Sequence, residues 1–265
     1  MAVALLWAEA MRTIVVAVLL VLMSGISAEA DLSGADIIQR MQLRRVQGDD
    51  AVSVLDVALV APDGARTTRT VATYRKRCGE EWRNLTVVRE PADVAGAGVL
   101  SWMHPDRRPD MWLYLPELGR IRQLNALAQR ERFLGSDLTY EDLTGQSFYD
   151  RTHELLGEED VDAEPTYRVE SRGTSAADAY ARIVTWVSRR TFLPVRAEYY
   201  GRDGRLQKLG SFGGVHEVKG IPTPATIVMA DVQSGHRTEI TVQQVDFGRT
   251  LECDLFTRRR LGRVP

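Results

Sequence analysis

Residues 110–143 read DMWLYLPELGRIRQLNALAQRERFLGSDLTYEDL, and this stretch decides the fold. Two strand-like runs, Met111–Leu115 and Arg120–Leu124, flank Pro116–Gly119, where proline and glycine are typical of a turn. Bulky apolar side chains occupy both faces of the first run. We therefore expect one face to pack on a helix or lid and the other to line a second apolar space, with an ordinary two-sided core as the alternative. The stretch carries almost no catalytic chemistry, which favours holding an apolar ligand over transforming one.

The first thirty residues have the composition of an export signal. Arg12 supplies a short basic region, Ile14–Met23 forms an apolar core, and Ser27–Ala30 offers the small residues that a signal peptidase recognises. This core is shorter than the roughly 20 residues that span a bilayer as a helix. We expect cleavage after residue 30 and a soluble exported product. Glu9 stands where a basic residue is wanted, so we hypothesise that translation starts at Met11.

Length and charge bound the remaining 235 residues (265 minus 30). They fit one domain, residues 31–265, within the range that barrels and sandwiches reach. The whole chain carries a formal charge of −2, and removing Glu9, Arg12 and Glu29 (net −1) leaves −1. This charge balance gives no electrostatic basis for binding nucleic acid. The protein is expected to be a monomer. The basic clusters 75–77 and 258–260 are interpreted as solvated strand ends rather than binding patches.

The two cysteines, Cys78 and Cys253, lie far apart in the sequence. In an oxidising compartment they could form a disulfide. Closing so long a loop would stabilise the fold by about 4–5 kcal/mol in the chain-entropy model. The sequence does not show that their Cα atoms come within reach, so a bridge and two buried thiols both stay open.

Hydrophobic periodicity predicts one helix followed by many short strands. Residues 31–47 place apolar side chains on one face of a helix, which Ser33 or Asp31 caps and Gly48 ends. Period-two runs then recur between turn residues such as Pro62–Gly64. The predicted strands are 52–60, 66–77, 81–89, 99–103, 111–115, 120–124, 149–156, 167–171, 181–189, 195–200, 206–212, 226–232 and 238–247. Such spacing, with few helices, is typical of an antiparallel barrel or sandwich.

The segment WLYLPELGRIRQL (residues 112–124), followed by FLGSDLTYEDL (residues 133–143), resembles the hallmark region of a known family. This family is the outer-membrane lipoprotein-sorting proteins, the LolA-like periplasmic carriers, in their uncharacterised branch. The resemblance implies a mainly β fold with a few helices (α+β). It further implies an incomplete antiparallel half-barrel, a helical lid, and an apolar cavity between them that accepts acyl chains.

The same resemblance implies a location and partners. The founding carriers work in the periplasm, where they take lipoproteins from an inner-membrane transporter and pass them to an outer-membrane receptor. A lipoprotein or lipid cargo and these two kinds of membrane partner are therefore expected here. This branch departs from the founding carriers in sequence, and their cavity arginine is not matched to any one arginine of this chain.

Strand alternation assigns a set of apolar side chains to the cavity wall: Met111, Leu113, Leu115, Ile183, Val187, Val195, Tyr199, Ile227, Met229, Ile240 and Val242. The assignment holds for one strand parity, because a one-residue shift in register reverses every inward and outward side chain. A second set is assigned to the lid: Phe133, Leu134, Leu138, Tyr140 and Leu143. Gly135 would be its joint, and Ser136 or Asp137 its helix cap. Alternatively, this segment plugs the end of the barrel.

Motifs for catalysis are absent from the sequence. The four histidines are scattered without ligand-like spacing, so neither a metal site nor a cofactor is expected. A nucleophile elbow, a phosphate loop and a dinucleotide fingerprint are all missing. The acidic residues between Glu158 and Glu164 lack the spacing and glycine of a calcium loop and are interpreted as a solvated loop. The sequence therefore predicts a protein that is not an enzyme.

Two functions compete on these grounds. The first is a periplasmic carrier of acylated or otherwise lipophilic cargo, for which one long acyl chain contributes on the order of 10 kcal/mol before ordering costs. The second is a non-transporting envelope module for interaction or sensing, associated with a membrane exporter. An envelope hydrolase is a third and weaker hypothesis.

Overall fold

The computed structural model describes residues 32–263 except 49, 106, 146, 147, 149 and 177. The expected export signal, residues 1–30, lies outside the described residues. Residues 33–265 form one compact unit, and the description below concerns this unit. In the described part of the chain, every helix is too short or too polar to cross a membrane.

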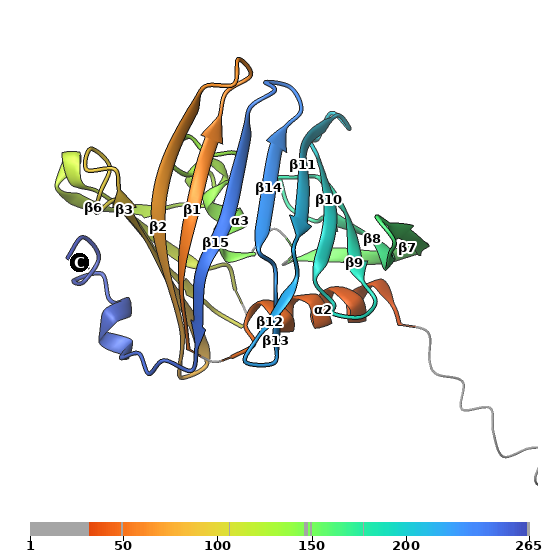
Figure 1. Cartoon of the computed structure of the whole chain (residues 1–265), viewed down its shortest axis with the longest axis horizontal. Coiled ribbons are helices and arrows are strands. Elements are labelled where there is room, and N and C mark those ends of the chain that lie inside the picture. Colours follow the sequence, from red (N-terminus) through yellow and green to blue (C-terminus); the bar gives the residue numbers. More distant parts are fainter. Residues whose placement is uncertain are drawn as a thin grey trace, which may run out of the picture. The chain divides into compact units, whose positions relative to one another are not determined.

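Antiparallel strands make up most of the fold. They are β1 Ala51–Val60, β2 Arg66–Cys78, β3 Glu81–Glu90, β4 Gly98–Met103, β5 Asp110–Leu115, β6 Arg120–Leu124, β7 Arg151–Val161, β8 Glu164–Gly173, β9 Arg182–Ser188, β10 Pro194–Tyr200, β11 Leu206–Gly213, β12 His216–Val218, β13 Ile221–Thr223, β14 Thr226–Asp231 and β15 Arg237–Phe247. Thirteen of them form one sheet in the order β6-β5-β4-β3-β2-β1-β15-β14-β11-β10-β9-β8-β7. Figure 1 shows the first and last of the long strands, β1 and β15, side by side in its middle.

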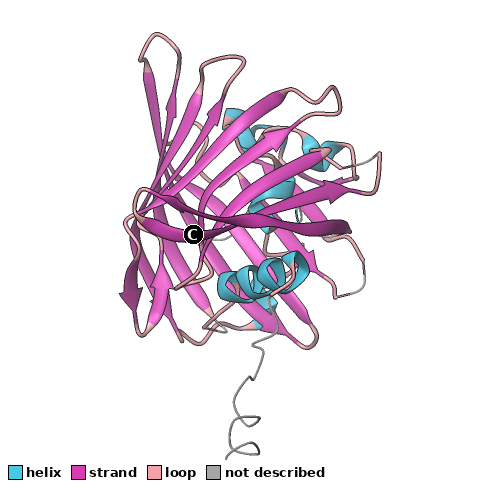
Figure 2. Cartoon of the chain, turned by 90° about the vertical axis from the view of Figure 1, so that its right-hand side faces the viewer, coloured by secondary structure: helices cyan, strands magenta, loops and turns pink. Residues whose placement is uncertain are grey.

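The sheet curves but does not close. Most neighbours in the sheet are also neighbours in the sequence, because short turns connect them. At one such turn Gly119 adopts a left-handed conformation (φ 59°), which glycine tolerates without steric cost. Figure 2 shows the strands curving round the helices. The strands β6 and β7 are the two free ends of the sheet. The prediction of a mainly β, incomplete half-barrel is confirmed.

One amphipathic helix, α2 (Gly34–Arg45), packs against β7 and β8. Ser33 caps it, and the side chain of Asp36 bonds back to Ser33 in a capping box. Ile37 and Met41 are among the residues of its buried face. Gly34 lies so close to the β7 backbone that a β-carbon there would sit 2.7 Å from Glu154. With these bounds, Gly34–Arg45, the helix begins later and ends earlier than the predicted range 31–47.

Short helices form the segment from residue 125 to residue 145, which we call the lid segment. It contains the 3₁₀ helices η2 (Ala128–Arg130) and η3 (Phe133–Gly135) and the helix α3 (Tyr140–Thr144). Thr139 caps α3, and Asp142 completes a capping box with it. The predicted caps, Ser136 and Asp137, were wrong, because the helix starts three residues later than that prediction requires.

The two faces of β4, β5 and β6 pack on different parts of the chain. Met111 and Leu113 face the lid segment and share a buried cluster with Phe133 and Tyr140. Trp112 faces the other way and shares a cluster with residues of the C-terminal segment, residues 251–261. Both faces of this strand are thus largely buried, and the second face packs on the C-terminal segment.

A disulfide fastens the C-terminal segment to the sheet. It joins Cys78, at the end of β2, to Cys253, whose Cα atom is 6.0 Å away. Cys253 begins the 3₁₀ helix η5 (Cys253–Phe256). The cluster 258–260 follows this helix and does not end a strand, so that part of the sequence interpretation was wrong.

Two further features differ from the sequence predictions. The acidic run is not a loop, because β7 continues to Val161 and pairs with β8. Two of its acidic side chains form ion pairs, Glu158 with Arg189 and Glu159 with Arg168 at 3.4 Å. These pairs offset the repulsion between the like charges of the strand. The hairpin β12–β13 was not predicted, since each of its strands has only three residues.

Candidate functional site

A cavity of about 710 Å³ lies between the concave face of the sheet, α2 and the lid segment. Both halves of the chain contribute to its wall, since its residues come from β1, β2 and β3 as well as β10, β14 and β15. The apolar part of the wall includes Leu55, Val57, Val71, Phe133, Leu138, Leu143, Phe148, Leu193, Tyr199, Phe212, Ile227, Met229, Ile240, Val242, Val245 and Phe247. The wall is therefore mainly apolar, in the size range of sites that bind small organic ligands.

Strand parity decides which side chains reach this cavity. On β15, Ile240 and Val242 line it, and further along Val245 and Phe247 do so. The switch from even to odd numbers follows a register shift opposite Val54 and Leu55 of β1, where an extra residue enters β15. Both ends of β15 thus present apolar side chains to the same space.

Eight of the residues assigned from the sequence lie along the cavity. From the wall set these are Tyr199, Ile227, Met229, Ile240 and Val242, and from the lid set they are Phe133, Leu138 and Leu143. Their contact with a cargo stays a prediction.

The other assigned residues lie outside the cavity wall. Met111, Leu113 and Leu115 pack under the lid segment, with Leu134 and Tyr140 on the lid side of the same packing. Ile183 and Val187 are fully buried within β9.

Val195 misses the cavity for a separate reason. The register between β9 and β10 shifts between Pro194 and Arg196, and Pro194 lines the cavity instead. Uninterrupted alternation along β10, on which the assignment depended, does not hold at this bulge.

Arg69 brings a charge into the apolar wall. Its side chain lies on β2 and lines the cavity together with Val71 and Thr73, which share its strand parity. Its guanidinium donates a hydrogen bond of 2.6 Å to the backbone oxygen of Leu134 in the lid segment. Its buried Nε has no hydrogen-bond partner among the described residues, and burial lowers the pKa of Arg69. This arginine therefore ties the sheet to the lid from inside the cavity.

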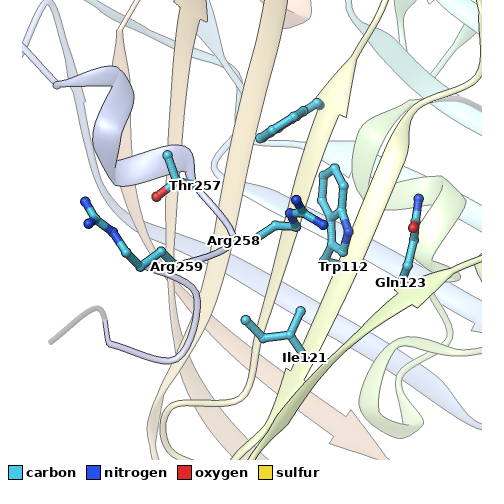
Figure 3. Close-up of a pocket in the computed structure, with 7 residues that line it drawn as sticks. Trp112, Ile121, Gln123, Thr257, Arg258 and Arg259 are labelled. Carbon is cyan, nitrogen blue, oxygen red and sulfur yellow. The ribbon is translucent and has the colours of Figure 1, made fainter.

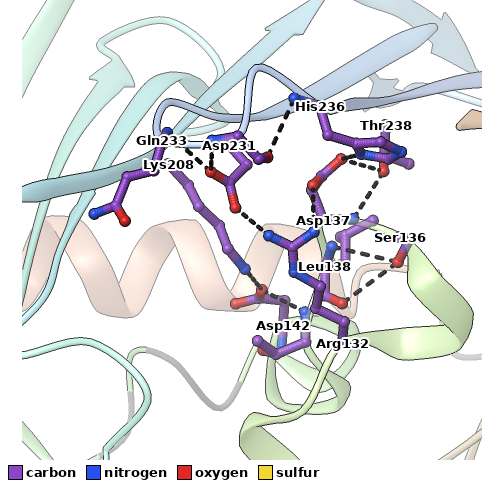
Figure 4. A network of polar contacts seen from close by, with 12 residues as sticks. Arg132, Ser136, Asp137, Leu138, Asp142, Lys208, Asp231, Gln233, His236 and Thr238 are labelled. Atoms are coloured by element: carbon purple, nitrogen blue, oxygen red, sulfur yellow. Dashed lines mark hydrogen bonds and ion pairs between the residues drawn. The ribbon is translucent and has the colours of Figure 1, made fainter. Parts of the chain in front are cut away.

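A second connection between the lid segment and the sheet centres on Asp137, whose side chain is fully buried (Figure 4). One carboxylate oxygen accepts a 2.8 Å hydrogen bond from Thr238 and lies 2.6 Å from Nδ1 of His236. The other oxygen lies 3.3 Å from Arg132, which also pairs with Asp231 of β14. We call these five residues the latch. It joins the lid to β14, β15 and their connecting turn.

Charged groups are also buried beneath α3. Lys208 of β11 donates to the hydroxyl of Tyr180 (2.9 Å), which donates in turn to Asp142 of the lid segment (2.8 Å). Glu141 is 2% exposed, and its burial, followed by the nearby charge of Asp142, raises its pKa to about 7. Burial lowers the pKa of Lys208. Two buried ionisable side chains, Glu141 and Lys208, thus lie where the lid segment meets the sheet.

Sequence reasoning missed Arg69, Val71 and the latch. The run Arg66–Cys78 is mostly polar, so it was not assigned to an apolar wall, although Arg69, Val71, Thr73 and Arg75 share one parity and all line the cavity. The described residues include no group of three or more His, Cys, Asp or Glu side chains placed to hold a metal ion.

Comparisons with known proteins agree with this architecture. A family model described as "Uncharacterized protein" matches residues 80–263, more than half of the chain. A comparison with curated proteins gave no match.

Three solved structures are similar over most of their length. A putative outer membrane lipoprotein-sorting protein domain from Vibrio parahaemolyticus is 25% identical, with a TM-score of 0.80, and the alignment covers 86% of this chain and 98% of that one. A DUF1329 family protein from Desulfovibrio piger is 28% identical, with a TM-score of 0.79 and coverage of 86% and 97%. A LolA superfamily protein from Nitrosomonas europaea is 24% identical, with a TM-score of 0.70 and coverage of 87% and 100%.

These matches bear on the resemblance inferred from residues 112–143. The family model covers all of that segment and the C-terminal half of the sheet, and the solved structures share the open half-barrel over 86% of this chain. The fold is shared with the LolA superfamily protein, and the chain belongs to the uncharacterized protein family whose model it matches.

Proposed function

We propose that the protein is a periplasmic carrier that binds lipoprotein acyl chains, or another lipophilic cargo, and transfers it between the inner and outer membranes. The observation that carries this proposal is the cavity of about 710 Å³, with an apolar wall drawn from both halves of the sheet. Loss of residues 1–30 on export would deliver the protein to the periplasm. An inner-membrane transporter and an outer-membrane acceptor would be its partners.

The lid segment gives such a carrier a way to release its cargo. Each buried methylene of an acyl chain contributes about 0.8 kcal/mol, so a long chain leaves a closed cavity slowly. The lid is held partly by polar contacts, those of Arg69 and of the latch, which water can replace when the lid opens. Opening of the lid would thus allow the cargo to leave.

The decisive experiment is native mass spectrometry of protein purified from its own periplasm. A co-purifying lipid or acylated peptide supports the carrier. An empty protein that also takes up no fluorescent fatty acid would contradict it and favour the interaction or sensor module.

Two neighbouring positions on β15 test whether the cavity is the site. Ile240 lines the cavity, whereas Thr241 is exposed and does not. We expect Ile240→Trp to fill the cavity and weaken binding of a fluorescent fatty acid about tenfold or more, equivalent to about 1.4 kcal/mol. The matched control Thr241→Trp should bind as the wild type does. Equal binding by both variants, with unchanged circular dichroism, would place the ligand elsewhere.

A further inference from the structure

A second pocket, of about 670 Å³, lies on the face of β5 and β6 that points away from the lid segment. The C-terminal segment forms its other side. Trp102, Trp112, Ile121, Gln123, Thr257, Arg258 and Arg259 line it, and we call it the outer pocket. The sheet separates it from the apolar cavity, because Trp112 and its neighbours Met111 and Leu113 point to opposite faces.

Two tryptophans in the outer pocket differ in their hydrogen bonding. Their rings lie 4.8 Å apart in an edge-to-face arrangement. The indole N–H of Trp102 donates to the backbone oxygen of Phe256 at 2.9 Å. Trp112 is 5% exposed, and its buried indole N–H has no partner among the described residues. Buried donors are almost always paired, and an indole nitrogen can only donate, so this position calls for an acceptor oxygen.

A cation lies beside that unpaired donor. The guanidinium of Arg258 is 5.6 Å from the centre of the Trp112 ring. Figure 3 shows the Trp112 indole between Arg258 and Gln123. The nearby carboxylate, Asp254, pairs with Arg259 (3.3 Å) and Arg260 (2.8 Å), and no described carboxylate pairs with Arg258. The outer pocket therefore offers hydrogen-bond donors and positive charge together, which suits a carboxylate.

The strand that forms one wall of this pocket is also an open edge. β6 is the last strand of the sheet and pairs only with β5. Its residues from Arg120 to Gln123 are exposed. The side chains of Ile121 and Gln123 face the pocket, and those of Arg120 and Arg122 lie on the opposite face of the strand. Such an edge can accept an extended peptide as an added strand, and its arginines repel a second copy of the same strand.

We propose that the outer pocket and the free edge of β6 bind an acidic, extended peptide segment of a partner protein. The segment would pair with β6 through its backbone and place a glutamate or aspartate carboxylate against Trp112 and Arg258. This site is independent of the apolar cavity, so cargo and partner can bind at the same time.

The test uses the full chain labelled with ¹⁵N at its tryptophan indoles. The probe is a blocked nonapeptide of alternating valine and glutamate, and its control has glutamine in place of glutamate. We expect the acidic peptide to shift the Trp112 indole resonance saturably. The resonance of Trp186 on β9, whose indole N–H is bonded to Glu159, serves as the internal reference and should not move.

A matched pair of arginine variants locates the carboxylate. Arg258→Gln should weaken binding of the acidic peptide about fivefold or more, because it removes the charged donor. Arg205→Gln, at an exposed turn between β10 and β11, should leave binding unchanged.

Three results would overturn the proposal. One is an equal response to the glutamate and glutamine peptides, and another is no response of Trp112 at saturating acidic peptide. The third is a shift of Trp112 by vesicles containing phosphatidylglycerol but not by the peptide, which would assign the site to a lipid headgroup.

Discussion

Single residues in this protein place charge where the sheet and lid meet. Arg69 reaches the lid from within an apolar wall, and Glu141 is an almost fully buried residue of α3. Neither role follows from the sequence, because each depends on which residues the fold brings near. Arg69 lies 65 positions from Leu134, whose backbone oxygen it bonds. The parity shared by Arg69 and Val71 was visible in the sequence, but nothing there indicated that this face would be covered.

The pKa of Glu141 predicts a pH-dependent stability. Its folded pKa is about 7, against an ordinary 4.5, so the unfolded chain loses this proton first as pH rises. Stability should therefore fall between pH 4.5 and 7, and the loss should be complete above pH 7. We expect Glu141→Gln to be more stable than the wild type at pH 8, by an amount on the order of 3 kcal/mol at most.

Thermal unfolding from pH 4.5 to pH 8 measures this effect. The advantage of Glu141→Gln over the wild type should grow up to about pH 7 and then level off. Glu217→Gln, at an exposed site on β12, is the control and should show no such growth. A constant difference across the range would show that Glu141 ionises as it does in the unfolded chain.

At the scale of elements, the strands were largely predictable and the lid was not. Alternating side chains and turn residues located the strands of the large sheet to within a few residues, because both signals are local. The lid segment consists of helices of three to five residues whose positions are set by contacts with the sheet. Its latch to β15 depends on these contacts, whereas its cap at Thr139 is a local capping box with Asp142. The bulges at Pro194 and in β15 were likewise invisible, and they changed which side chains line the cavity.

The latch predicts how easily the lid opens. Asp137→Asn removes a buried charge from between Arg132 and His236 and weakens the bond from Thr238. Because Arg132 is 42% exposed, solvent screens its pairing with Asp137, and the main loss is in the hydrogen bonds to the buried carboxylate, about 1.5–3 kcal/mol each. Hydrogen exchange at the backbone amides of residues 133–140 should therefore become faster in this variant, while exchange in β8 and β9 stays unchanged.

A surface substitution provides the control for the latch. Asp160→Asn, on the exposed acidic part of β7, should leave exchange in the lid segment as it is. Unchanged lid exchange in Asp137→Asn as well would mean that apolar packing alone holds the lid closed.

The whole unit combines an open sheet with a cross-link between distant parts of the chain. The disulfide Cys78–Cys253 closes a loop over 175 positions and holds the C-terminal segment against Trp102 and Trp112. The sequence left this pairing open, since it is a matter of distance in the fold. At this scale, strand spacing predicted an antiparallel barrel or sandwich, and the resemblance of residues 112–143 implied the open half-barrel.

Reduction should destabilise the protein as a whole. In the chain-entropy model, losing this bridge costs about 4–5 kcal/mol, so dithiothreitol should lower the melting temperature of the wild type by several degrees. The double variant Cys78→Ser, Cys253→Ser should already melt at the lower temperature and respond to dithiothreitol no further. A wild-type melting temperature that reductant does not change would show that packing of the C-terminal segment suffices without the bridge.

The pairing of β1 with β15 has a consequence for how the chain acquires its structure. Residues 51–60 are synthesised well before their partners, residues 237–247. The middle of the sheet therefore stays unfinished until nearly the whole chain is present. Contacts between such distant residues form slowly, and the strand edges stay exposed to aggregation in the meantime.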